Sequence, residues 1–301
     1  MLRRNELADQ RHGALVRCED DLMTPRLALC NEVLAPWPFE RQCEYASALG
    51  YHGLEVAPYT LQADPLQITA AQARRWAAVA SDHGLHISGL HWLLVAPQGL
   101  SISHPDGVVR RRTQQAIERL IELCALLGGA YLVHGSPAQR NPQPGQSVDD
   151  ALARATEVWV AAGECAARSS VTYCIEPLAR DQTTVVNTLE QALAIVRAAG
   201  LPHLKTMLDT SSAGATEVEP LPALIDRWWP SGALAHVQLN DRNRRGPGQG
   251  SDRFAPLLAA LARQGYGGWL AMEPFDYVPD GPACAAHSIG YVRALLEVAA
   301  A

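Results

Sequence analysis

Lysine is almost absent from this sequence of 301 residues, because Lys205 is the only one and arginine supplies the remaining positive charge. The formal net charge is −6, and no stretch of the chain forms a basic stripe. Nucleic-acid binding without sequence preference depends on such a surface to neutralise phosphates. No apolar run is long enough to span a bilayer. We therefore expect a small-molecule partner rather than a nucleic acid or a membrane.

Paired cysteine motifs are also missing. The seven cysteines are odd in number, include no CxxC pair and mostly lie in apolar runs, as reduced buried thiols do. This pattern argues against a disulfide framework or a zinc–cysteine site and favours a reducing compartment. The first residues carry charges throughout and lack the apolar core of a secretory signal. We predict a cytoplasmic protein in which residues 1–25 form a polar N-terminal extension.

Short apolar runs alternate with amphipathic stretches along the rest of the chain. The expected strands are 26–33, 53–57, 85–92, 130–135, 171–177, 204–209, 234–240 and 268–274. The expected helices are 39–50, 70–84, 110–129, 149–169, 188–200 and 254–265. Strict alternation predicts a parallel α/β sheet, and eight units fit a single (β/α)8 TIM barrel over residues 26–301. A doubly wound open sheet is the alternative, although its usual phosphate-binding turn would need glycine, which "NEVLAPWPFE" lacks.

The last four expected strands end in oxygen donors. These residues are Glu176, Asp209, Gln238 and Glu273. In a barrel the four positions are neighbours at the mouth where barrel enzymes place their chemistry. Converging carboxylates must be protonated, paired with arginine or neutralised by a cation. We predict a divalent metal site whose oxygen ligands suit Mn²⁺ best, then Mg²⁺, then Co²⁺ or Zn²⁺. A structural ion-pair network is the competing interpretation.

The segments that carry these residues resemble those of the xylose isomerase-like barrel family. "IEPLARDQTTVVNT", "LDTSS", "HVQLNDRNRRGPGQG" and "AMEPF" match its motifs in order and spacing, and the likeness covers roughly residues 26–298. The family includes ketose 3-epimerases, hydroxypyruvate isomerases, inosose and dehydroshikimate dehydratases and endonuclease IV-type enzymes. The resemblance implies that Glu176, Asp209, Gln238 and Glu273 bind the metal and that the two glutamates act as acid and base. It also implies a homo-oligomer, either a dimer or a tetramer.

The sequence differs from the epimerase pattern at two positions. The third ligand is often histidine, whereas this chain has Gln238, as hydroxypyruvate isomerases and some dehydroshikimate dehydratases do. Ser212 replaces a substrate-contacting histidine and is itself expected to contact the substrate. By the same resemblance, Arg244 and Gln182 occupy substrate-binding positions. His91 and His134 end the third and fourth strands, where each either contacts substrate or forms hydrogen bonds inside the site or core.

The chemistry implied is proton abstraction next to a carbonyl through a metal-bound enediolate, with Glu176 and Glu273 as candidate bases. Proton return to the opposite face gives epimerisation, and proton transfer to the adjacent carbon gives isomerisation. We therefore predict an isomerase or epimerase of a sugar or small hydroxy-carbonyl compound. Loss of a β-hydroxyl would instead make the protein a dehydratase or lyase on a keto-cyclitol, keto-glycoside or dehydroshikimate-like substrate. A nuclease and a non-catalytic sugar-binding barrel are further alternatives.

Overall fold

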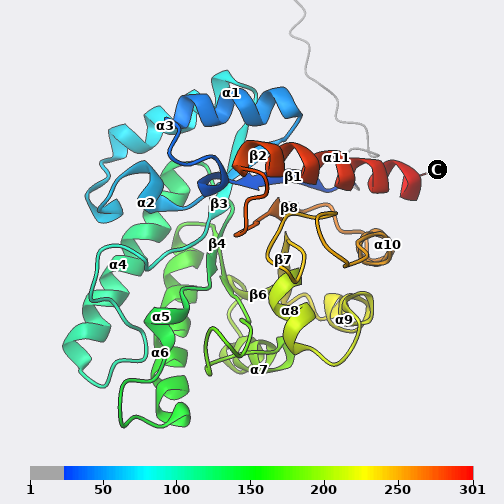
Figure 1. Ribbon diagram of the computed structural model, residues 1–301. Coiled ribbons are helices and arrows are strands. Elements are labelled where there is room, and N and C mark those ends of the chain that lie inside the picture. Colours follow the sequence, from blue (N-terminus) through cyan, green and yellow to red (C-terminus); the bar gives the residue numbers. More distant parts are fainter. Residues whose placement is uncertain (1–23, 301) are drawn as a thin grey trace, which may run out of the picture.

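The computed structural model describes residues 24–300, in which eight parallel strands close into a barrel in chain order (Figure 1). The strands are β1 (Arg26–Cys30), β2 (Gly53–Val56), β3 (His86–Leu90), β4 (Tyr131–His134), β5 (Thr172–Ile175), β6 (Leu204–Asp209), β7 (Leu234–Leu239) and β8 (Trp269–Met272). The barrel closes where β1 pairs with β8. The predicted (β/α)8 barrel is thus confirmed, and the doubly wound sheet is excluded. Most of the proposed 1–25 extension lies outside the described residues.

Helices surround the barrel. They are α1 (Phe39–Leu49), α2 (Pro58–Leu61), α3 (Ala70–Asp82), α4 (Gly107–Leu126), α5 (Pro137–Arg140), α6 (Val148–Arg168), α7 (Leu189–Ala199), α8 (Thr210–Thr216), α9 (Leu221–Trp228), α10 (Ala255–Arg263) and α11 (Gly281–Ala300). Short 3₁₀ turns are η2 (Asn31–Leu34), η3 (Pro65–Gln67) and η4 (Trp229–Ser231). The six helices expected from the sequence all form, while α2, α5, α8, α9 and α11 were not foreseen. Ser147 and Thr188 cap α6 and α7 through their side chains, which accept backbone N–H groups.

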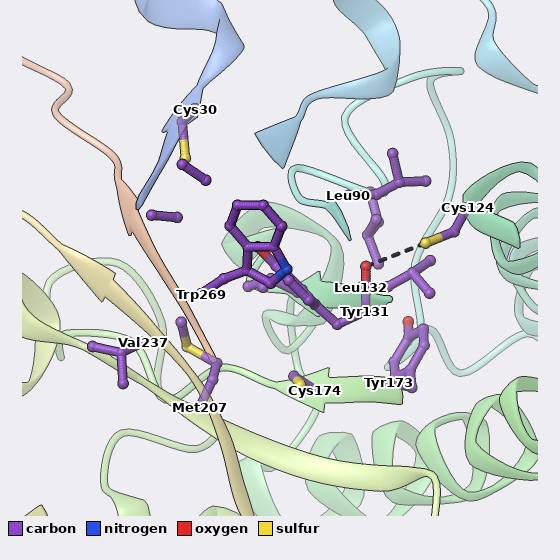
Figure 2. Close-up of a cluster of buried hydrophobic side chains, with 14 of the residues drawn as sticks. Cys30, Leu90, Cys124, Tyr131, Leu132, Tyr173, Cys174, Met207, Val237 and Trp269 are labelled. Atoms are coloured by element: carbon purple, nitrogen blue, oxygen red, sulfur yellow. Dashed lines mark hydrogen bonds between the residues drawn. The ribbon is translucent and has the colours of Figure 1, made fainter. Parts of the chain in front are cut away.

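Apolar side chains from the strands and from the surrounding helices form the buried core. Figure 2 shows Leu90, Leu132, Met207, Val237 and Trp269 in this core. Cys124 packs there too, and its thiol donates a hydrogen bond to the carbonyl of Tyr131. The six cysteines within the described range are free and buried, as predicted, and Cys18 lies outside it. Over residues 24–300, none of the helices combines the length and apolarity needed to cross a membrane.

The segment from Ser136 to Ser147 connects β4 to α6 and contains the short helix α5. Arg140, at the end of α5, is completely buried. Its guanidinium donates hydrogen bonds to the carbonyls of Gly135 and Glu176, at 2.9 and 2.8 Å. Arg140 therefore ties together the residues that follow β4 and β5.

Candidate active site

Three acidic side chains converge at the mouth, as the sequence predicted. Glu176 directly follows β5, Asp209 ends β6 and Glu273 directly follows β8. One carboxylate oxygen from each lies within 4.8 Å of the others. All three residues are buried, and Asp209 Oδ2 and Glu273 Oε2 have no hydrogen-bond partner. The three also line a pocket of about 400 Å³.

The electrostatics of this cluster follow from burial and from like charge. Burial raises the pKa of Glu176 and of Glu273 well above the usual range, and the neighbouring carboxylates raise both further. Burial also raises the pKa of Asp209 to about 6, although the backbone N–H of Ser212 donates to it at 2.6 Å. Without a cation, the cluster therefore holds its protons to a higher pH than free carboxylates do. Unpartnered oxygens in an all-oxygen donor set fit a hard divalent cation, which would take the place of those protons.

Gln238 lies beside Asp209, because the two residues are paired between β7 and β6. Its side chain is completely buried, and its Nε2 donates a hydrogen bond of 2.6 Å to Glu55. Its Oε1 has no partner. The residue therefore offers one free oxygen atom, and its role as the fourth ligand stays a prediction.

Glu55, on β2, is a buried residue of the site that the sequence analysis missed. Tyr131 donates a hydrogen bond of 2.5 Å to its Oε2, and His236 Nε2 lies 2.9 Å from the same oxygen. Burial alone would raise the pKa of Glu55, but His236, His91 and Tyr131 hold it at about 2. The only signal in the sequence was a glutamate within the apolar run "GLEVA".

The two predicted histidines occupy different surroundings. His91 lines the pocket, and its Nε2 lies 2.8 Å from Glu32 Oε2. Burial lowers the pKa of His91, but Glu32 and Glu55 outweigh this effect and raise it. Cys30, Glu32, His91 and Glu273 also form a group of possible ligands, in which the His91–Glu32 contact already engages the imidazole.

His134 is buried, and it is absent from the described residues that line the pocket. Its Nδ1 lies 2.6 Å from the Tyr173 hydroxyl and accepts a hydrogen bond from Trp159 at 3.2 Å. Burial lowers the pKa of His134 well below its ordinary value, which keeps the imidazole neutral. The core therefore supplies hydrogen bonds to Nδ1 only, while Nε2 has no partner, and substrate contact by His134 stays a prediction.

The remaining predicted substrate residues, Gln182, Ser212 and Arg244, all line the pocket. Arg244 is half exposed in the loop after β7, and its guanidinium pairs with Asp181, in the loop after β5, at 2.9 Å. Trp92 and Phe275 form an edge-to-face pair in the same wall, with ring centroids 6.0 Å apart. The pocket therefore combines carboxylates, hydrogen-bonding groups and an aromatic surface.

Several sugar epimerases are similar to this chain in sequence or in fold. The chain is 25% identical to a probable ketose 3-epimerase of Synechocystis sp. over 236 residues, which cover 77% of each protein. It is 26% identical to a 3-dehydro-D-guloside 4-epimerase of Escherichia coli over 199 residues, covering 62% of this chain and 74% of the relative. Its fold superposes on the structure of an L-ribulose 3-epimerase with a TM-score of 0.79 at 22% identity, covering 92% of this chain and 96% of the other.

A family model supplies the assignment. Residues 43–295 match the xylose isomerase-like TIM barrel, a span that includes all four strand-end oxygen donors. The closed barrel of eight parallel strands agrees with this match. The chain belongs to the xylose isomerase-like TIM barrel family.

Proposed function

We propose that this protein is a divalent-metal-dependent epimerase or isomerase of a sugar or a small hydroxy-carbonyl compound. The observation that carries the proposal is the convergence of Glu176, Asp209 and Glu273 on one pocket, where they are buried and two of their oxygens have no partner. The names of the relatives, which include ketose 3-epimerases and a keto-sugar 4-epimerase, support the same class of reaction.

The residues that would hold the cation are Glu176, Asp209, Gln238 and Glu273. Their donor atoms are carboxylate and amide oxygens, for which Mn²⁺ is our first choice and Mg²⁺ the second. When bound, such a cation supplies positive charge that stabilises the negative charge developing on a substrate carbonyl oxygen.

The two glutamates are suited to proton transfer. Glu176 and Glu273 follow β5 and β8, and β6 and β7 separate those strands, so the carboxylates approach the pocket from different sides. One glutamate removes the proton next to the carbonyl, and the other returns a proton to the opposite face, which inverts that carbon.

The pocket wall indicates a polyhydroxylated substrate. Gln182, Ser212 and Arg244 offer hydrogen-bonding groups beside the carboxylates. Ser212 Oγ lies 3.5 Å from Gln182 Oε1, so a hydroxyl of a substrate could bind to both side chains. A free sugar fits this set of donors and acceptors.

Incubation with a panel of ketoses and keto-glycosides in D₂O tests the proposal. Protein loaded with Mn²⁺ should introduce deuterium at the carbon next to the carbonyl, observed by NMR, and should form the epimer or isomer. Metal-free protein is the control and should give no exchange. A new enone absorbance with loss of water would instead identify a dehydratase. Absence of exchange with every substrate of the panel would contradict the enolisation chemistry.

A further inference from the structure

We propose that Glu55 is a positioning residue that turns the amide oxygen of Gln238 toward the cation site; this inference rests on the proposed metal binding. Glu55 lies on β2 and Gln238 on β7, which are not neighbours in the barrel. The hydrogen bond of 2.6 Å from Gln238 Nε2 to Glu55 Oε1 therefore crosses the barrel interior. Both side chains are completely buried.

The chemistry of the two groups fixes the orientation of the amide. A carboxylate oxygen only accepts hydrogen bonds, whereas a glutamine amide has one donating and one accepting end. Rotation of the Gln238 amide by half a turn would place its oxygen, an acceptor, 2.6 Å from the acceptor Glu55 Oε1. Glu55 therefore selects the rotamer in which Gln238 Oε1 points away from it, and that oxygen is the atom left without a partner.

Glu55 is itself held in place by groups from other strands. Tyr131, on β4, donates to Glu55 Oε2 at 2.5 Å, and His236, on β7, lies 2.9 Å from the same oxygen. The rings of Tyr131 and His236 stack with centroids 4.0 Å apart. Oε2 is thus occupied, and Oε1 accepts its shortest hydrogen bond from Gln238, while the Cys30 thiol at 3.6 Å and His91 Nδ1 at 3.3 Å lie farther from the same oxygen. A histidine that binds a metal usually donates its second ring N–H to a carboxylate, which fixes the ring. Glu55 is the corresponding fixed acceptor for the amide of Gln238.

The first test compares two substitutions that each remove one buried negative charge near the site. Glu55→Gln leaves two amides facing each other, so either end of Gln238 can point at the cation. Glu32→Gln removes a buried carboxylate that hydrogen-bonds to His91 instead. We expect Glu55→Gln to weaken Mn²⁺ binding about tenfold, as loss of an outer partner of a ligand does, and Glu32→Gln to weaken it clearly less. Mn²⁺ affinity is measured by titration with EPR detection of free Mn²⁺.

The second test is a double-mutant cycle at pH 8 that exchanges the acid and the amide between positions 55 and 238. Gln238→Glu in the wild-type background places two carboxylates in contact and should weaken Mn²⁺ binding. In the Glu55→Gln background, the amide introduced on β2 can donate to the new carboxylate on β7, and the same substitution should strengthen binding. A simple gain of ligand charge would strengthen binding in both backgrounds, and a purely structural defect would weaken it in both. Only the positioning role predicts this change of sign.

Folding of each metal-free variant is checked by circular dichroism. If Glu55→Gln does not fold, Tyr131→Phe keeps the volume, removes the hydrogen bond that fixes Glu55 Oε2, and should weaken Mn²⁺ binding in the same direction. Equal losses for Glu55→Gln and Glu32→Gln, or an effect of Gln238→Glu with the same sign in both backgrounds, would overturn the positioning role. Wild-type protein that binds no Mn²⁺ would overturn the proposed metal site, and the positioning role with it.

Discussion

At the scale of single residues, Glu176 and Glu273 carry the proposed proton transfers. Replacing either with glutamine keeps the shape of the side chain but removes its ability to accept a proton. We expect Glu176→Gln and Glu273→Gln each to lower the rate of deuterium exchange by about 10²–10⁴-fold, the usual contribution of a general acid or base. The measurement is NMR of a substrate in D₂O at saturating Mn²⁺.

A matched control separates catalysis from general damage. Glu190 lies exposed in the first turn of α7, and Glu190→Gln should exchange deuterium at the wild-type rate. Because the two catalytic candidates are also predicted ligands, each variant is assayed at several Mn²⁺ concentrations. Exchange at the wild-type rate in Glu176→Gln or Glu273→Gln would remove that residue from the mechanism.

The strand-end donors could be predicted from the sequence, whereas Glu55 could not. Glu176, Asp209, Gln238 and Glu273 each end an apolar run, and the geometry of a parallel barrel brings such ends together. Glu55 lies within its strand, and its partners Tyr131, His236 and Gln238 come from β4 and β7. Those contacts depend on how the barrel interior packs, which the spacing of residues along one strand does not encode.

At the scale of elements, the turn after β4 shapes the carboxylate cluster. A Cβ atom at Gly135 would lie 2.2 Å from Glu176 Oε2, so the carboxylate could not keep its position beside an alanine. We expect Gly135→Ala to weaken Mn²⁺ binding and to lower kcat/KM about 10²-fold, as displacement of a reacting group by about 1 Å does. Calorimetric titration with Mn²⁺ and steady-state kinetics check both effects.

Gly290→Ala in α11 is the matched control for this substitution. Space around its Cβ position is open within 4 Å over the described residues, and Gly290 is exposed. Alanine in the interior of a helix should stabilise the protein by about 0.5–1 kcal/mol without altering Mn²⁺ binding. A Gly135→Ala protein with wild-type affinity and kcat/KM would show that Glu176 can act from a different position.

The loop after β7 brings Arg244 to the pocket, and this placement can be tested separately. Arg244 is 49% exposed and its partner Asp181 is 68% exposed, so their ion pair contributes little to stability. Arg244→Ala should therefore raise KM about tenfold with a smaller change in kcat, because it removes binding that is equal in the ground and transition states. Arg245→Ala is the control, because Arg245 pairs with Asp276 and is absent from the described pocket lining. An unchanged KM in Arg244→Ala would place the substrate elsewhere.

The elements that the sequence analysis missed have local explanations. Asp209 both ends β6 and caps α8, whose residues "TSSAGAT" look like a loop because serine, threonine and glycine are weak helix formers. The side chain of Asp209 accepts the backbone N–H of Ser212, and this hydrogen bond starts the helix. Ser212, which stands where the epimerase pattern has a histidine, therefore lies in the first turn of α8, next to the proposed cation site.

At the scale of the whole molecule, the cluster links folding stability to pH. The folded-state pKa values of Glu176, Asp209 and Glu273 lie above their unfolded values, so their contribution to stability is complete below about pH 4 and is lost as pH rises through the folded values. With a folded pKa of about 6, Asp209 alone loses about 1 kcal/mol between pH 5 and pH 8. The two glutamates add to this loss.

The melting temperature of metal-free protein should therefore fall between pH 5 and pH 8 relative to that of Asp209→Asn, by roughly 2–4 °C for each kcal/mol. The Asp209→Asn variant is the reference because the lowered pKa of His134 makes stability rise with pH, and this opposite effect is present in both proteins.

At pH 8, Mn²⁺ at a hundred times its dissociation constant should increase the free energy of unfolding by about 2.7 kcal/mol. At pH 5 protons compete for the same oxygens, so the gain should be much smaller. Calorimetry at pH 5 and at pH 8, each with EDTA and with Mn²⁺, measures the melting temperature under all four conditions. A stabilisation by Mn²⁺ that does not depend on pH would place the ion outside this cluster.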